Sequence, residues 1–447
     1  MRILILLSVG FLAIYVSPTN QNRNFVSSSD FAPLISTRGL LQDEAVSKIE
    51  DNTLARIEEQ LAKSRGKIRK AIVEKSFVSN ETNGSFITER TIYKNPFAFF
   101  QSHNEMMKTF KIWTYEEGDI PLVHDGPMKC IYSIEGDFIQ FMERKGNQMA
   151  ASHPDEAHAF FIPISITNIV HYLYTPSSNA FAFIDQQMEA IVEDYINIIS
   201  HKYPYWNRSN GADHFFVSCH DWAPFVTRGN AKMFENFIRV LCNANTSEGF
   251  VPNRDVSMTE INGPADNIPI VSSGQSPYNR SILAFFAGGN HGYVRKKLFQ
   301  YWGSKQDKDI QVYNHLPKDQ NYTKLMGQSM FCLCPSGYEI ASARATEAIY
   351  VGCIPVMIKS HYALPYGDVL DWSRFSVQVP VDNIQDLKRI LQEMPFIKYL
   401  EMQNKVMEVQ KHFMVNIPAK KFDVIHMILH SVWLRRLNVK LNPFNLS

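Results

Sequence analysis

The residues best suited to acid–base chemistry lie between positions 214 and 224. The apolar stretch 214–218 predicts a strand, and His220 and Asp221 follow it directly with Trp222 beside them. Either His220 or Asp221 could act as a general base, and the indole ring could stack on a sugar. A strand end closed by structural hydrogen bonds of the same two residues is the equally open alternative.

A glycine loop, Gly288-Gly289-Asn290-His291-Gly292, offers a possible phosphate site. It follows a predicted buried strand at 282–287 and precedes a predicted helix at 294–302. Glycine lets the backbone approach a ligand, and a helix N-terminus attracts phosphate. The spacing is not GxGxxG, so a tight turn without a ligand is an equal alternative.

A second strand–turn–helix stretch runs from Cys334 to Pro355 and includes Ser336, Glu339, Arg344 and Glu347. The helix is predicted at 341–351, so Arg344 lies in its first turn, where a cation opposes the helix dipole at a cost of about 0.3–1 kcal/mol. A diphosphate bound there would offset this cost, and Glu347 could hold a ribose diol. A surface ion pair between Arg344 and Glu347 is the alternative.

Two motifs resemble metal sites but fit other roles better. Asp307-Lys308-Asp309 has the DxD pattern, but it precedes its predicted strand, so we interpret it as a solvated loop. His426 and His430 have zincin spacing, yet Met427 stands where such a site needs Glu, which favours helix-packing histidines. We therefore predict no bound metal.

The elements that position these residues change character along the chain. The first half is expected to mix strands at 111–115, 159–164 and 214–218 with helices at 136–144 and 186–201, and 253–276 is expected to link two domains. The second half alternates strands at 282–287, 310–313, 331–334, 354–358 and 375–379 with helices at 294–302, 322–328, 341–351 and 383–393. Such alternation predicts a parallel sheet, whose ligands bind at the carboxyl ends of the strands. A last helix at 422–437 carries an apolar face.

Length and composition limit the possible classes. The chain has 447 residues, 45% hydrophobic and 20% charged, which fits an ordinary globular protein with more than one domain. Lys+Arg 45 against Asp+Glu 44 leaves a net charge of +1, so no overall basic field attracts nucleic acid.

The N-terminus predicts entry into the secretory lumen. Residues 3–16 are apolar, and we favour an uncleaved signal anchor (1–17) over a cleaved signal peptide. A tether follows at 18–42. A helix is expected at 43–72, with Leu54, Ile57, Leu61, Ser64, Ile68 and Ala71 at 3/4 spacing. A solvated amphipathic helix is favoured over a coiled-coil stem.

Lumenal chemistry also agrees with the sequons and cysteines. Glycosylation is expected at Asn80, Asn83, Asn207, Asn245, Asn279 and Asn321, whereas Asn445 lies too near the C-terminus. The lumen permits disulfides, but six cysteines allow many pairings and the sequence does not choose among them.

With these residues in view, the chain resembles the plant exostosin-like glycosyltransferases (family 47) from about residue 111 to 441. The most specific stretches are 218–224 (SCHDWAP), 284–288 (AFFAG) and 331–355. The resemblance implies an α/β fold of two Rossmann-like domains (GT-B type). The expected boundaries are anchor 1–17, stem 18–90, acceptor-side domain 91–275, donor domain 276–410 and a helix crossing back, 411–447.

The resemblance also implies a function: a Golgi type II membrane enzyme that inverts the anomeric carbon without a metal or other cofactor. Its partners would be a nucleotide sugar, such as a UDP-sugar, a cell-wall polysaccharide acceptor, the Golgi membrane and a possible dimer partner. The implied base is Asp221, with Asp213 second and His220 nearby. The implied donor-binding residues are Gly288, Gly289, His291, Ser336, Glu339, Arg344 and Glu347.

One position departs from the family pattern. Relatives often carry a basic residue where this chain has Gly289, so Arg280 or Arg295 would have to supply the charge. The rival from another class is therefore a non-catalytic partner of another transferase. A glycoside hydrolase ranks last because no carboxylate pair stands out.

Overall fold

The computed structural model describes residues 37–77, 91–174, 181–264, 274–303 and 307–441. Contacts divide the chain into residues 1–48 and a compact unit of residues 49–447, and the account below concerns the second unit. In the described part of the chain, no helix has both the length and the apolar character needed to cross a membrane. The predicted anchor, the tether, and the sequons at Asn80 and Asn83 lie outside the described residues.

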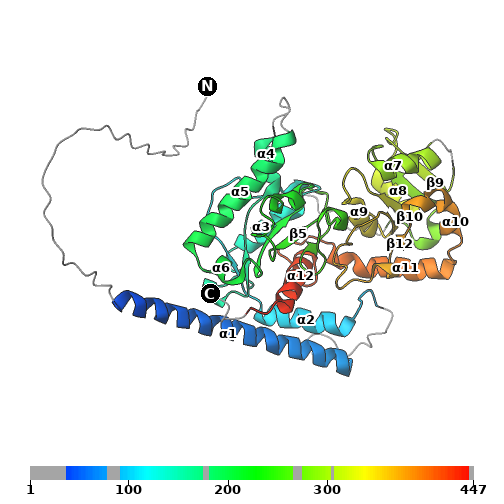
Figure 1. The fold of residues 1–447 in the computed structure, drawn as a ribbon. Helices are drawn as coiled ribbons and strands as arrows, with labels where there is room; N and C mark the ends of the chain where they lie inside the picture. The colour runs from blue at the N-terminus through cyan, green and yellow to red at the C-terminus, as the bar shows by residue number, and fades with distance from the viewer. Residues whose placement is uncertain (1–36, 78–90, 175–180, 265–273, 304–306, 442–447) are drawn as a thin grey trace, which may run out of the picture. The chain divides into compact units, whose positions relative to one another are not determined.

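The first half of this unit is built on a five-stranded parallel sheet (Figure 1). Its strands are β1 (Ile112–Thr114), β3 (Ala159–Phe161), β4 (His214–Ser218), β5 (Ile238–Leu241) and β6 (Val256–Ser257), and they lie side by side in chain order. Alternate residues face opposite sides. Phe160 and Phe216 pack with helices α4 (Ile166–Leu173) and α5 (Phe181–Lys202), whereas Phe161 and Phe215 face a second core.

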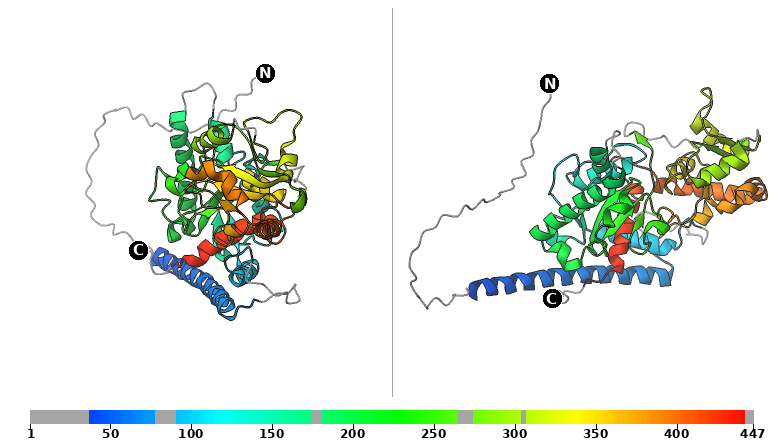
Figure 2. Two further views of the ribbon diagram at one scale, coloured as in Figure 1. Left: turned by 90° about the vertical axis from the view of Figure 1, so that its right-hand side faces the viewer. Right: turned by 45° about the horizontal axis from the view of Figure 1, so that its top comes forward.

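The second core joins three segments that are far apart in sequence. Helices α2 (Pro96–Thr109), α3 (Ser133–Glu143) and α12 (Val424–Asn438) contribute to it, and the C-terminal helix α12 contacts β5, β6 and α2. The right-hand view in Figure 2 shows this red helix beside the green strands of the first sheet. The chain therefore ends on the half where the described body begins.

The second half carries another five-stranded parallel sheet. Its strands are β8 (Ile282–Ala287), β9 (Ile310–Tyr313), β10 (Ser329–Pro335), β11 (Ile354–Ile358) and β12 (Val377–Gln378), in the spatial order β12-β11-β10-β8-β9. Helices α7 (Tyr293–Leu298), α8 (Tyr322–Gln328), α9 (Arg344–Tyr350), α10 (Leu387–Gln392) and α11 (Phe396–Val409) follow or join the strands. The predicted strand–helix alternation and the mixed α/β class with two parallel sheets are confirmed.

Helix α1 (Thr37–Glu74) corrects one expectation. The helix exists, but its apolar face is not solvated: Leu54, Ile57 and Leu61 are buried, and the last two belong to the main core. Polar contacts fix the same face, because Arg436 of α12 donates to Glu58 at 2.6 Å and Arg65 donates to the Leu437 carbonyl at 2.9 Å. The sequence predicted the apolar stripe of α1. The stripe packs into the core of the same chain, and its polar neighbours form hydrogen bonds with helix α12.

Two disulfides bridge neighbouring strand regions. Cys219–Cys242 links the residues that follow β4 and β5, and Cys332–Cys353 links β10 to the residue before β11. The first pair therefore fixes two strand ends, and the second ties the middle of β10 to the start of β11. Cys130 and Cys334 are free thiols.

Candidate active site

A cavity of about 280 Å³ lies between the two halves. The first half contributes Ile131, Asp221 and Glu260, and the second contributes His291, Arg295, Gly337, Tyr338, Glu339, Ala341, Ser342, Ala343, Arg344 and Glu347. All of these side chains except Ile131 come from segments that follow the carboxyl ends of β4, β6, β8 and β10. This is where parallel α/β sheets bind their ligands.

The strand order of the second sheet explains why the cavity forms there. The chain passes from β8 to β9 in one direction and then reverses, so that β10 lies on the other side of β8. The loops after β8 and β10 diverge at this switch point and leave a crevice between them. The glycine loop and the Ser336–Arg344 stretch are these two loops, so the sequence placed both candidate motifs correctly.

Two arginines form the strongest electrostatic feature of the cavity. Arg344 and Arg295 both lie over the Phe286 ring, at 4.6 and 5.8 Å from its centroid. No described carboxylate is within ion-pair distance of either guanidinium, and the Nε atom of each is buried without a hydrogen-bond partner. Burial and the charge of Arg344 lower the pKa of Arg295 to about 10. Two adjacent, unneutralised cations are suited to a diphosphate.

Two glycines leave room for close contacts: Gly288 for the Arg344 guanidinium, and Gly292 for the backbone of the loop at Gly337. A side chain at Gly288 would lie 2.7 Å from Nη2 of Arg344, which donates to the Ala287 carbonyl at 2.9 Å. Gly292 has φ +77°, and a Cβ there would collide with the carbonyl oxygen of Gly337. The space beside Gly288 therefore holds Arg344, and contact of a ligand with the Gly288 backbone stays a prediction.

His291 lies between the two loops. Its ring stacks on Tyr338 with centroids 5.1 Å apart, and Nη1 of Arg295 lies 2.8 Å from its Nε2. Because arginine can only donate, Nε2 accepts and the proton of the neutral ring is on Nδ1. Burial together with Arg295 and Arg344 lowers the pKa of His291. His291 can therefore donate a hydrogen bond to a ligand without adding a charge.

The first half brings two carboxyl groups to the cavity. Asp221 accepts a hydrogen bond from the Tyr132 hydroxyl at 3.0 Å, and burial raises its pKa. Glu260 is 4% exposed, and burial together with the charge of Asp221 raises its pKa to about 8. Near neutral pH the proton therefore stays on Glu260.

Hydrogen bonds across the cavity hold the halves together. Asn243 donates to Glu339 at 2.9 Å, and Thr259 bonds Thr346 through their hydroxyls. Glu347 accepts from Tyr322 at 2.8 Å and from Asn262 at 3.4 Å. The alternative of an Arg344–Glu347 ion pair is therefore not seen, because Glu347 is occupied by neutral donors.

Other predicted residues lie elsewhere. Asp213 precedes β4, at the edge opposite Asp221, where it is buried and paired with Arg208 and His214. His220 accepts from the Trp222 backbone N–H, and burial with His171 lowers its pKa to about 4, which fits a structural role. Ser336 and Gly289 adjoin the cavity loops but do not line it.

The metal-like motifs are held by other contacts. Asp307 and Asp309 both pair with Lys388, at 2.8 and 2.9 Å, so the loop is fixed to α10 rather than simply solvated. His430 is buried and bonds Ser102 at 2.9 Å, which confirms the packing interpretation. Among the described residues, no group of three or more His, Cys, Asp or Glu side chains could hold a metal.

Sequence reasoning missed Glu260, and it left Arg295 as one of two options. Glu260 follows a strand of two residues, which is too short to give a periodic signal. Arg280, the other option, donates from its guanidinium to three backbone carbonyls, of Gln275, Ser329 and Val351. Arg295 therefore supplies the second cation.

Comparisons with known proteins identify the class that this fold and site belong to. The exostosin GT47 domain family matches residues 101–394. A probable glycosyltransferase of Arabidopsis thaliana is 47% identical over 390 residues, covering 87% of this chain and 73% of that protein, and a second is 47% identical over 388 residues (86% and 82%). A probable glucuronosyltransferase of Oryza sativa subsp. japonica is 29% identical over 303 residues (63% and 69%).

These matches establish the family. The chain belongs to the exostosin GT47 family and is a glycosyltransferase. The resemblance drawn from the three sequence stretches is thereby confirmed.

Proposed function

We propose that the chain is an inverting, metal-independent transferase that moves a sugar from a nucleoside diphosphate donor, such as a UDP-sugar, to a hydroxyl of a cell-wall polysaccharide. The observation that carries the proposal is the unneutralised pair Arg295 and Arg344 beside Asp221. One part of the cavity suits a leaving diphosphate, and the other suits an attacking hydroxyl. A hydrolase is not favoured, because the matching family and the similar relatives named above are glycosyltransferases.

The mechanism is a single displacement. Asp221 accepts the proton of the acceptor hydroxyl, whose oxygen attacks the anomeric carbon as the bond to the diphosphate breaks. Arg344 and Arg295 stabilise the charge that collects on the leaving diphosphate. His291 donates from Nδ1 to a diphosphate oxygen. Tyr132 holds the Asp221 carboxylate in place.

The cellular setting is part of the proposal. The two disulfides support an oxidising compartment. Of the expected glycosylation sites that the structure describes, Asn207, Asn279 and Asn321 are exposed, whereas Asn245 is partly buried. We place the body in the Golgi lumen behind a type II anchor. Treatment with a glycan-removing enzyme should lower the mass, and alkaline carbonate should leave the chain in the membrane pellet. A glycan-free chain would contradict the lumenal placement.

The test of the function is a panel of UDP- and GDP-sugars offered to the full-length chain with plant cell-wall oligosaccharides. Binding of one nucleotide sugar and transfer from it are expected. The α1 helix should be kept in any shortened chain, because Ile57 and Leu61 belong to the core. A chain that binds no donor and transfers nothing would favour the non-catalytic partner of another transferase.

A further inference from the structure

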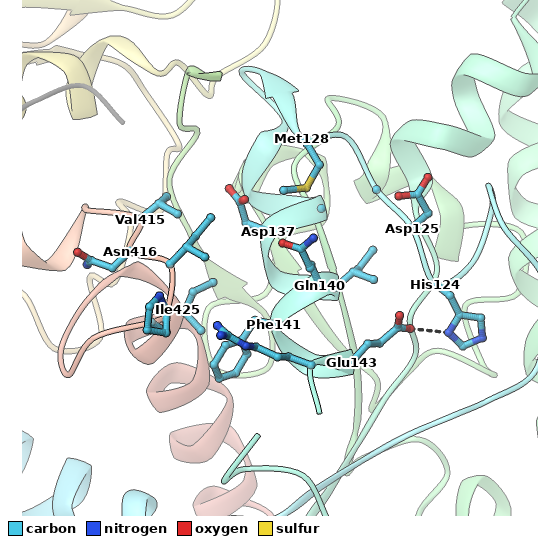
Figure 3. A pocket seen from close by; sticks show the side chains of 17 residues that line it. His124, Asp125, Met128, Asp137, Gln140, Phe141, Glu143, Val415, Asn416 and Ile425 are labelled. Carbon is cyan, nitrogen blue, oxygen red and sulfur yellow. Dashed lines mark hydrogen bonds and ion pairs between the residues drawn. The ribbon is translucent and has the colours of Figure 1, made fainter. Parts of the chain in front are cut away.

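A second and larger cavity, of about 580 Å³, lies beside helix α3 (Figure 3). Three segments line it: the loop of residues 124–128, helix α3, and residues 415–419 with Ile425 of α12. It shares no lining residue with the cavity that holds Asp221 and Arg344. Nothing in the proposed mechanism uses it.

The polar residues of this cavity lie on facing walls. Figure 3 shows Asp137 and Gln140 on one side of α3, with Val415 and Asn416 across from them. Asp137 is partly buried and accepts no hydrogen bond from any residue that the structure describes, and burial raises its pKa to about 6. Asn416 is held in place because its amide donates to Asp423 at 3.2 Å. A desolvated carboxylate without a donor favours a ligand that brings hydroxyl groups.

The remaining lining residues narrow the ligand class. Met128, Phe141, Val415 and Ile425 supply apolar surface between the polar groups. Asp125, Asp137 and Glu143 give the cavity three carboxylates, against the cation of Arg144 and the imidazole of His124, which is paired with Glu143 at 2.5 Å. The excess of negative charge disfavours nucleotides and acidic sugars. A neutral sugar fits, since its hydroxyl rim meets the polar groups and its C–H faces meet the apolar ones.

Helix α3 connects this cavity to the active site. Its N-cap residue, Tyr132, donates to Asp221, and Asp137 and Gln140 lie five and eight residues further along. At 1.5 Å per residue, this places them roughly 8–12 Å along the helix from Tyr132. This separation along the axis is within the length of a hexasaccharide, and the proposal requires that the acceptor also passes around the helix from the face of Tyr132 to that of Asp137.

We propose that the cavity binds a neutral sugar unit of the acceptor chain, remote from the hydroxyl that is attacked. The inference rests on the proposed transferase function and adds to it a preference for long, uncharged acceptors. Asp137 and Gln140 are the residues that recognise this unit, with Asn416 opposite them.

The test compares acceptors of two lengths. Neutral disaccharides and hexasaccharides of xylan, glucan, mannan and galactan type are offered to the full-length chain with the donor it uses. In Asp137→Asn and in Gln140→Ala, the ratio of kcat/KM for hexasaccharide over disaccharide should fall about tenfold. Gln140 is exposed, so its replacement does not disturb the core. The control Asp319→Asn, an exposed carboxylate elsewhere, should keep the wild-type ratio.

A binding measurement separates this inference from the proposed function. Saturation-transfer NMR with the same hexasaccharides needs no turnover, and wild-type binding that weakens about tenfold in Asp137→Asn supports the site even if no sugar is transferred. Absence of transfer would count against the proposed function alone. The inference is overturned if no neutral hexasaccharide binds or if both variants keep the wild-type ratio. It is also overturned if kcat/KM falls by the same factor for the disaccharide and the hexasaccharide.

Discussion

The two parallel sheets of this transferase are alike in size and differ in strand order and in the charge at their carboxyl edges. In the second sheet the order reverses between β8 and β10, and the helices that follow these two strands, α7 and α9, carry Arg295 and Arg344. In the first sheet the described strands follow chain order, and the edge carries Asp221 and Glu260. In the proposed function, one edge therefore attracts an anion and the other accepts a proton.

The difference indicates how the halves divide one reaction. A switch point opens a crevice at the carboxyl ends of the strands, where a diphosphate could bind. The sequential sheet has no such crevice among its described strands, and its contribution comes from residues just past the strands that reach across to the other half. Hydrogen bonds from Asn243 to Glu339 and between Thr259 and Thr346 hold these residues close to the second half. Variants on each edge should therefore change different measurements.

The largest effect is expected at the proton-handling edge. Asp221→Asn keeps the shape of the side chain and removes the proton acceptor, so turnover should fall by about 10²–10⁴ while nucleotide binding is kept. Single-turnover kinetics and calorimetric titration with the nucleoside diphosphate measure the two separately. Near-normal turnover would remove Asp221 from the mechanism.

Asp213 provides the contrast for this prediction. Asp213 directly precedes β4, whereas Asp221 follows it. The carboxylate of Asp213 is buried and forms an ion pair with Arg208. Asp213→Asn should therefore lower the melting temperature, because an unpaired buried Arg costs about 3–5 kcal/mol. Turnover per folded molecule should not show the loss seen for Asp221→Asn.

At the anion-binding edge, Arg344→Ala should weaken nucleoside diphosphate binding by about 1.5–3 kcal/mol, the range for charge-assisted hydrogen bonds. This corresponds to about ten- to 150-fold in Kd. Arg344→Lys should also be impaired because lysine lacks the planar fork. Arg374→Ala, an exposed arginine paired with Asp371, is the matched control. Unchanged affinity in Arg344→Ala would place the diphosphate elsewhere.

A smaller effect separates the two carboxyl groups. The raised pKa of Asp221 means that activity falls as pH drops through that value, since the base must be ionised. Glu260 holds its proton up to about pH 8, so if its neutral form is required, activity falls again above that pH. Glu260→Gln stays neutral at every pH and should remove the alkaline limb, an increase of about tenfold one unit above the pKa. Loss of all activity in Glu260→Gln would make Glu260 the base.

The sequence predicted the second sheet better than the first. Strands β8, β9 and β11 are short, mostly apolar runs bounded by turn residues, and they were predicted to the residue. The first sheet includes β6, of two residues, within a segment expected to be a linker. Such a strand exists only through its pairing with β5, which no local pattern reveals.

The same contrast holds for the site. Arg344, His291 and Glu347 were found because they follow strands whose ends are marked by glycine and proline. Arg295 and Arg344 meet over Phe286 because helices α7 and α9 approach each other in space, and the raised pKa of Glu260 depends on burial. Side-chain identity gives the chemistry available, whereas burial and neighbours decide which groups keep their charge.

The smallest expected effect is that of a chelator. If the arginines alone stabilise the diphosphate, turnover should be unchanged in excess EDTA. The DxD residues do not oppose this, because the ammonium group of Lys388 already binds Asp307 and Asp309, and they precede β9 at the edge opposite the cavity. Lys388→Ala should accordingly create no dependence on Mn²⁺. Loss of turnover in EDTA that Mn²⁺ restores would show that the two arginines are insufficient, and that the charge at the switch point is completed by a metal.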